Sequence, residues 1–299
     1  MPHELTTILE RDGLIRLPSL LSASQLRGMQ EAFQTRLQRM AWNDVPGFER
    51  TEMFRHMIQD VLVLDQGFLD VALHPLVKQV LHEYLGPHFQ LVEAKGWRSL
   101  PTKKDFHGWH GDAWYDQSIH RDIPREIKLA IYLTDVTSGS FAYIKGSHGK
   151  QHPRLIPDRE LTGVSEESIV HMTGPAGSAF MFDTSGIHRQ STPVLEARQA
   201  IFLNYHDPAV PLQREDIEYY RYHPLLLNAA FLGNLTREDE RILGFGDKRN
   251  YQHGFVRRRR HPALEAMNRS FVEMTMQVNH AMYYPRRALS KMRAALGLV

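Results

Sequence analysis

The chain has 299 residues, 17 of them histidine and none cysteine. Disulfides, thiolate zinc sites, cysteine-ligated iron–sulfur clusters and cysteine nucleophiles are therefore excluded. Any metal must be held by imidazole and carboxylate groups, which suit iron, zinc, manganese or nickel better than Cu(I). A hydrophobic fraction of 42% and a charged fraction of 23% are typical of a globular protein of one large or two small domains.

The formal net charge is only +2, but it is unevenly distributed. Residues 256–299 carry nine basic side chains, four of them in the run Arg257–Arg260, against Glu265 and Glu273, which leaves +7 on this segment and −5 on the rest. A basic segment of this kind could contact nucleic acid, a membrane surface or an anionic substrate. We favour a solvated helical tail and expect no nucleic-acid partner, because basic stripes interleaved with aromatic residues are missing.

The first residues, Met1–Thr7, lack the basic and apolar regions of a secretory signal peptide. No uncharged apolar run reaches the ~18 residues that a transmembrane helix needs. We therefore expect a cytoplasmic protein with no transmembrane segment.

The N-terminal part is predicted to be mostly helical. Residues 13–17 form a short β-like run, and Ser22 or Ser24 can then cap a helix. A second helix is predicted over Pro75–Leu85, with Gly86 as its end. The positions expected to face inward are Leu26, Met29, Phe33, Leu37 and Met40 in the first helix and Val77, Val80, Leu81 and Tyr84 in the second.

From about residue 88 the pattern changes to short β-like runs separated by glycine, proline and serine, at 89–100, 128–136, 141–144, 169–172, 178–182 and 199–205. Many short strands with such punctuation favour an all-β sandwich, barrel or jelly roll over βαβ units. We therefore predict a single domain over 1–299: helical support over 1–87, a β core over 88–206 and a helical region over 207–299. The last helical stretch, from Leu264 to Met282, has an apolar stripe that fits a core or a subunit contact, so a homodimer is one expectation.

A candidate metal site begins at His110-x-Asp112, because residues two apart on a strand point to the same face. With 17 histidines and 16 aspartates, chance alone supplies about one such pair, and the chain has a second at His120-x-Asp122. We favour the first pair, since tryptophans and glycines surround it, whereas the second lies in a polar, loop-like stretch.

A third ligand should come from a distant strand. His188 is the best candidate, because the strand 178–182 runs into a glycine turn that presents it. Ten residues later Arg198 opens the apolar strand 199–205. A buried guanidinium there needs an anionic partner, either an internal carboxylate or the carboxylate of a ligand.

Taken in order, five elements resemble the phytanoyl-CoA dioxygenase family of Fe(II)- and 2-oxoglutarate-dependent oxygenases. They are His110-x-Asp112, the strand 129–135, the stretch Ser138–His148 with its Gly-Ser-His turn, His188 and Arg198. The resemblance covers roughly residues 88–206 and implies a mainly β fold with flanking helices around a double-stranded β-helix (jelly-roll, cupin-like) core.

The resemblance also implies roles for single residues. His110, Asp112 and His188 would bind Fe(II), and Arg198 would bind the distal carboxylate of 2-oxoglutarate. Lys128 would line the cosubstrate pocket. Relatives often carry a small or hydroxyl residue two positions after the distal histidine or the arginine, where this chain has Gln190 and Ala200.

The expected reaction is therefore hydroxylation of a small molecule with O₂, releasing succinate and CO₂. Specialised metabolites and acyl, amino-acid-derived or sugar-derived compounds all remain open as substrates, and Arg98, Arg221 and the Arg257–Arg260 run would suit an anionic group. A divalent-metal hydrolase, isomerase or epimerase on a cupin-like barrel could use the same three ligands, but it leaves Arg198 without a role.

Overall fold

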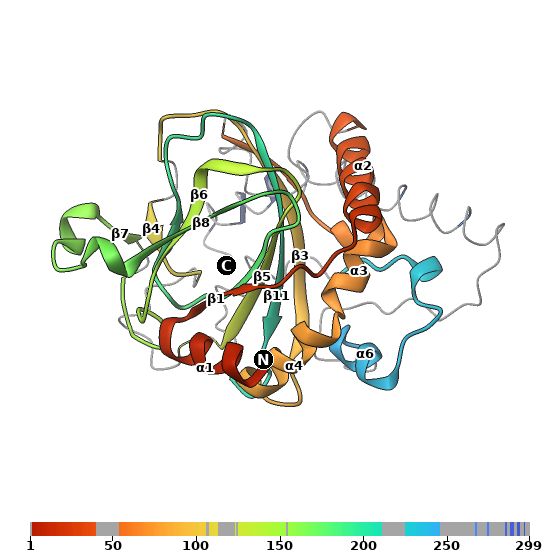
Figure 1. Cartoon of the computed structure of the whole chain (residues 1–299). Helices are drawn as coiled ribbons and strands as arrows, with labels where there is room; N and C mark the ends of the chain where they lie inside the picture. The colour runs from red at the N-terminus through yellow and green to blue at the C-terminus, as the bar shows by residue number, and fades with distance from the viewer. Residues whose placement is uncertain are drawn as a thin grey trace.

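A computed structural model describes residues 2–39, 54–105, 108–112, 123, 125–153, 155–210 and 225–245, together with isolated positions between 267 and 296. Two antiparallel sheets face each other and form the core (Figure 1). The six-stranded sheet has the order β1 (Leu14–Leu17), β9 (Ala179–Asp183), β5 (Glu126–Tyr132), β11 (Arg198–His206), β3 (Gln90–Ser99) and β2 (Arg55–Ile58). The five-stranded sheet has the order β7 (Leu155–Ile156), β4 (Trp109–His110), β10 (His188–Gln190), β6 (Val136–Ile144) and β8 (Ile169–Gly174). The predicted jelly-roll core with flanking helices is confirmed.

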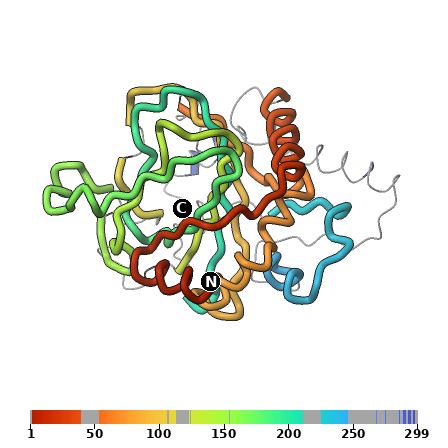
Figure 2. Tube along the Cα trace, viewed as in Figure 1, coloured from red at the N-terminus to blue at the C-terminus, as the bar shows by residue number. Residues whose placement is uncertain are grey.

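The helices cover the large sheet from outside. They are α1 (Pro2–Asp12), α2 (Ala23–Arg39), α3 (Gln66–Ala72), α4 (Pro75–Leu85) and α6 (Arg237–Ile242), with 3₁₀ turns at Val61–Val63, Asp158–Leu161, Glu166–Ser168 and Ala229–Phe231. Figure 1 shows α1 and α4 at one end of the barrel and α2, α3 and α6 along its side. The Cα trace in Figure 2 shows the N-terminal segment crossing from α1 through β1 to α2.

The alternation of side chains along β5 separates two cores. Ile127, Leu129 and Ile131 point outward and pack in the large cluster that the helices share. Ala130 and Tyr132 point inward and join the aromatic cluster between the two sheets. Because successive residues of a strand point to opposite faces, the outer face can be purely apolar while the inner face carries the functional groups.

Most of the predicted elements are present. The helix over Pro75–Leu85 has Pro75 in its first turn and ends at Gly86, and its Val77, Val80 and Leu81 are buried. Ser22 caps α2 by accepting a hydrogen bond from the amide of Gln25 at 3.3 Å. The strand predicted at 13–17 is β1, and the six later runs correspond to β3, β5, β6, β8, β9 and β11.

Several elements were not predicted: α1, α3, β2 and the short strands β4, β7 and β10. Strands β1 and β2 come from the N-terminal third yet extend the large sheet at its two edges. The division at residues 88 and 206 stays a prediction.

Some of the predicted features fall wholly or partly outside the part of the chain that the structure describes. Met40, the His120/Asp122 pair, Arg221 and the Arg257–Arg260 run lie outside the described residues. Of the predicted apolar stripe, Met267 and Met274 are described and are 66% and 54% exposed. Among the described residues, no helix has both the length and the apolar character to cross a membrane.

The contact between α2 and the large sheet generates a test of the fold. Gly96, on the outer face of β3, lies where an added methyl group would overlap the Phe33 ring of α2 and approach Val61. We expect Gly96→Ala to lower the free energy of unfolding by about 1–3 kcal/mol, because the core there has no spare volume. Urea denaturation of Gly96→Ala and wild type measures this. Gly163→Ala is the matched control, because an added methyl group there meets nothing within 4 Å, and equal midpoints for the two variants would contradict the packing argument.

Candidate metal centre

Strand pairing brings two distant histidines side by side. His110 ends β4 and His188 begins β10, and the two are direct partners in the antiparallel register. Their rings lie 4.5 Å apart between centroids, and both residues are buried. The pairing of β4 with β10 thus brings together two residues that are nearly eighty positions apart in the sequence.

The two histidines are held in the same way. The Nδ1 atom of His110 lies 2.8 Å from the carbonyl oxygen of Gly108, and Nδ1 of His188 lies 2.8 Å from that of Gly186. A carbonyl oxygen can only accept, so each Nδ1 carries the proton and donates it. Each Nε2 therefore carries no proton and is the ring atom that can bind a metal, an arrangement that typically orients metal-binding histidines.

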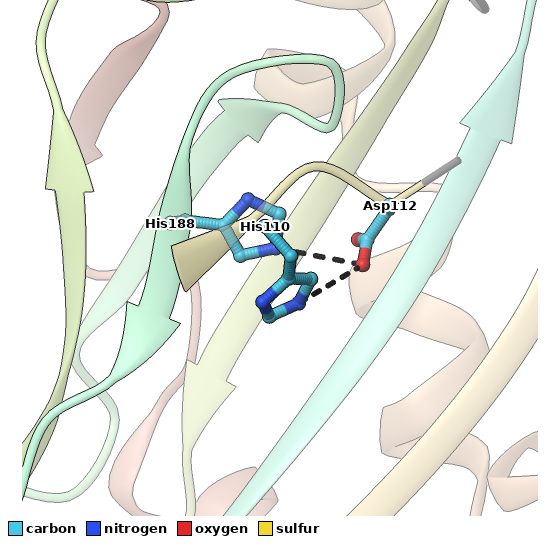
Figure 3. A group of neighbouring side chains, drawn as sticks. All are labelled: His110, Asp112 and His188. Carbon is cyan, nitrogen blue, oxygen red and sulfur yellow. Dashed lines mark ion pairs between the residues drawn. The ribbon is translucent and has the colours of Figure 1, made fainter. Parts of the chain in front are cut away.

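Asp112 completes the cluster from the loop after β4 (Figure 3). Its amide donates to the carbonyl of Thr184 at 2.9 Å, which ties this loop to the turn before His188. Its Oδ1 lies 3.7 Å from Nε2 of His110 and 3.5 Å from Nε2 of His188. His110 and Asp112 were predicted to lie on one strand, and this prediction is wrong, because β4 ends at His110.

The three side chains offer ligand atoms that all lie within 4.8 Å of one another, and among the described residues they form a candidate metal-binding group. Burial and the neighbouring His188 lower the pKa of His110 to about 3, although Asp112 opposes this. Burial would raise the pKa of Asp112, but Lys128 and the two histidines outweigh it and hold that pKa well below its ordinary value. At neutral pH the site is therefore a neutral His110 imidazole beside an ionised carboxylate, which is the protonation state that divalent metals bind.

Aromatic rings enclose His188. Tyr143 stacks on it with ring centroids 6.3 Å apart, and the rings of Phe141 and Phe182 lie at 5.3 and 5.1 Å. Gly186 is required here, because a Cβ atom at this position would overlap the Tyr143 hydroxyl. This hydroxyl donates to the carbonyl of Asp183 at 3.0 Å. Tyr143 therefore contacts the turn that presents His188 at both Asp183 and Gly186.

A chain of buried charges leads away from Asp112. The Nζ atom of Lys128 lies 2.6 Å from Oδ2 of Asp112 and 3.8 Å from Oε2 of Glu93. Glu93 in turn pairs with Lys95. Glu93 and Lys95 were not predicted to belong to this group. Their signal in the sequence was two charged residues two positions apart inside the apolar strand 89–100, which indicates charged side chains on the inner face of that strand.

Arg198 is 6% exposed and lies on the inner face at the start of β11. Its Cζ atom lies 5.8 Å from the centre of the Tyr132 ring. Within the described part of the chain, its Nε atom has no hydrogen-bond partner. The same holds for Nε2 of Gln190, whose Oε1 accepts from the Ser99 hydroxyl at 2.9 Å. Ser99 is the register partner of Arg198. Two donors that lack an acceptor among the described residues, Nε of Arg198 and Nε2 of Gln190, are therefore both next to Ser99.

The structure thus brings together His110, Asp112, His188 and Lys128 from the predicted set, while Arg198 lies on the inner face at the start of β11. The carbonyl acceptors at Gly108 and Gly186 were not predicted. Their signal was a glycine two residues before each histidine, in Gly108-Trp109-His110 and Gly186-Ile187-His188.

The solved structures that share the fold include the following three. EctD from S. alaskensis, with 2-oxoglutarate and 5-hydroxyectoine, is 20% identical with a TM-score of 0.56, covering 70% of this chain and 77% of its own. HygX from Streptomyces hygroscopicus, with nickel and 2-oxoglutarate, is 18% identical with a TM-score of 0.52, covering 71% and 89%. The non-heme alpha ketoglutarate dependent epimerase SnoN from nogalamycin biosynthesis is 17% identical with a TM-score of 0.53, covering 73% and 88%. Identities this low establish a common fold only.

No curated protein matches the sequence significantly. The family described as phytanoyl-CoA dioxygenase (PhyH), in contrast, matches residues 9–193, which is more than half of the chain and includes all three residues of the metal-binding group. The chain therefore belongs to the phytanoyl-CoA dioxygenase family of Fe(II)- and 2-oxoglutarate-dependent oxygenases.

Proposed function

We propose that the chain is a dioxygenase that holds Fe(II) through His110, Asp112 and His188 and hydroxylates a small-molecule substrate with release of succinate and CO₂. The observation that carries this proposal is the convergence of two imidazole Nε2 atoms on one oxygen of Asp112, at 3.7 and 3.5 Å. Two imidazoles and one carboxylate on one face are the donor set of non-haem Fe(II) oxygenases, which keep open positions on the metal.

The residues present fit that group. The protons of both histidines are on Nδ1, in hydrogen bonds to Gly108 and Gly186, so both Nε2 atoms are available without a change of tautomer. When bound, Fe(II) and 2-oxoglutarate supply the oxidising chemistry, in which O₂ is consumed and the cosubstrate is decarboxylated. This chain's residues place the metal, orient the cosubstrate and exclude water.

Arg198 supports the cosubstrate assignment. A buried guanidinium with an unfilled Nε donor among the described residues is suited to a carboxylate, which it can bind through two parallel hydrogen bonds. Gln190 offers a second donor, held in place by Ser99. The amide of Gln190 would thus stand at one of the two positions where relatives often carry a small or hydroxyl residue.

Lys128 was expected to line the cosubstrate pocket, and this stays a prediction. Its ammonium group is already engaged by Asp112 and lies near Glu93. These contacts favour a role at Asp112, the proposed metal ligand.

The alternative function is a metal-dependent reaction that inserts no oxygen, for which hydrolysis, isomerisation and epimerisation are the candidates. The observation that favours it is that SnoN, a structure with a TM-score of 0.53 to this chain, is an alpha ketoglutarate dependent epimerase. Both outcomes use the same three ligands. Turnover under ¹⁸O₂ separates them, since only hydroxylation places a labelled atom in the product formed from the substrate, whereas succinate carries label in any 2-oxoglutarate-dependent reaction.

Removal of one histidine should abolish cosubstrate chelation. Anaerobic protein with Fe(II) and 2-oxoglutarate is expected to show a weak visible charge-transfer band at roughly 500–530 nm. His110→Ala should lose it, because one of three metal ligands is gone. His82→Ala is the matched control, since His82 is exposed on α4. A band that persists in His110→Ala would contradict the ligand assignment, and a wild type without any band would contradict the proposed function.

Removal of the guanidinium should act on the cosubstrate and not on the metal. We expect Arg198→Met to raise KM for 2-oxoglutarate by about 100-fold or more, because a charge-assisted pair in a buried site is lost, while the Kd for Fe(II) changes little. Succinate release measures the first quantity and calorimetric titration the second. Arg159→Met, at an exposed arginine, is the control. Unchanged KM in Arg198→Met would remove Arg198 from the cosubstrate site.

A further inference from the structure

The inner face of the barrel buries an alternating series of charges: Asp112, Lys128, Glu93 and Lys95. Lys128, Glu93 and Lys95 are each at most 6% exposed, and the side chain of Asp112 is 10% exposed. Lys128 contacts Asp112 on one side and faces Glu93 on the other, and Lys95 contacts the remaining oxygen of Glu93. The series therefore begins at the proposed metal ligand and passes from Lys128 on β5 to Glu93 and Lys95 on β3.

Stability alone gives no reason for this series. Taking paired charges out of water costs several kcal/mol per ion, and well-packed apolar residues of the same volume are often neutral or stabilising in their place. Buried charge networks with shifted pKa values occur preferentially at functional sites. The inner face could have continued the aromatic cluster of Tyr132 and Phe180, but instead it carries ions next to the metal-binding group.

The two oxygens of Asp112 have different surroundings. Oδ1 is the atom that both histidines face, at 3.7 and 3.5 Å. Oδ2 is turned away and accepts a hydrogen bond from Lys128 at 2.6 Å. A carboxylate whose second oxygen is engaged in this way binds a metal through one atom, whereas a carboxylate with both oxygens free can chelate and take a further coordination position.

We propose that Lys128 is a positioning residue that holds Oδ2 of Asp112 and so restricts this ligand to one oxygen, which preserves the coordination positions that the cosubstrate needs. This inference rests on the proposed function, because it takes His110, Asp112 and His188 as metal ligands. Glu93 and Lys95 keep the ammonium in place: Glu93 attracts Lys128 from the far side, and Lys95 anchors Glu93.

The ammonium has a second effect, on charge. A positive group within hydrogen-bond distance of a ligand carboxylate repels the incoming divalent ion, so Lys128 should weaken metal binding while it improves cosubstrate binding. This combination is distinctive. A residue that merely supports the fold would weaken both when removed, and a residue that binds 2-oxoglutarate directly would leave the metal affinity unchanged.

The test compares Lys128→Met, which removes charge and hydrogen bond, with Lys128→Gln, which removes the charge but keeps a donor for Oδ2. Co(II) is the probe, because its visible spectrum reports coordination and its affinity can be titrated in the whole protein without turnover. Lys104→Met, at an exposed lysine, is the matched control.

We expect both Lys128 variants to bind Co(II) about tenfold more tightly than wild type, because a repelling charge is gone. Lys128→Met should also bind 2-oxoglutarate to the Co(II) protein about tenfold more weakly and show an altered Co(II) spectrum, since Asp112 can then chelate. Lys128→Gln should keep the wild-type spectrum and a 2-oxoglutarate affinity within about threefold of wild type.

Each other outcome decides against the inference. Unchanged or weaker Co(II) binding in Lys128→Gln overturns it, and this holds even if Lys128→Met does not fold. Equal loss of 2-oxoglutarate binding in both variants, with unchanged Co(II) affinity, assigns Lys128 to the cosubstrate instead. A wild type that binds no Co(II) would overturn the proposed function itself, and the two failures are thereby distinguishable.

Discussion

The hydrogen bond between Lys128 and Asp112, inside a core of two antiparallel sheets, is the interaction on which the proposed metal centre depends. A buried ionised carboxylate is costly unless a charge or a metal compensates it. Here the ammonium compensates one oxygen, and the other remains directed at the two histidines. The centre is therefore preorganised before a metal arrives, with the negative charge retained and only one of its oxygens available.

This preorganisation requires a rigid surrounding, and the large sheet supplies it by dividing its two faces. On β5 the outward residues Ile127, Leu129 and Ile131 join the helices in the apolar core, while Lys128 on the inward face reaches Asp112. The free energy that burial of the outer face contributes allows the inner face to carry charges that contribute little or nothing to stability. Substitutions on the two faces should accordingly have different consequences, stability outside and metal chemistry inside.

The fold was predictable where local pattern decides it. Glycine and proline punctuation located six strands, and Pro75 and Gly86 marked both ends of α4. The short strands β4 and β10, with two and three residues, were not predictable, because strands this short have no period and exist only through their pairing with β6 and β7. Asp112 was misplaced for the same reason: nothing in the sequence marks the end of a two-residue strand.

The site was predictable in its residue types and only partly in its arrangement. The family resemblance depended on the order of four residues along the chain, His110, Asp112, His188 and Arg198. The pairing of β4 with β10 places the two histidines of this set side by side. Neither sequence distance nor composition could show that Lys128 meets the second oxygen of Asp112, because the contact joins a loop to a strand across the barrel. A lysine within a strand predicts only that an anionic group lies nearby. The three-dimensional structure identifies that group as the carboxylate of Asp112. That the anion is a metal ligand makes the lysine a regulator of the ion's coordination, a role that falls to residues one layer removed from the metal in many metalloproteins.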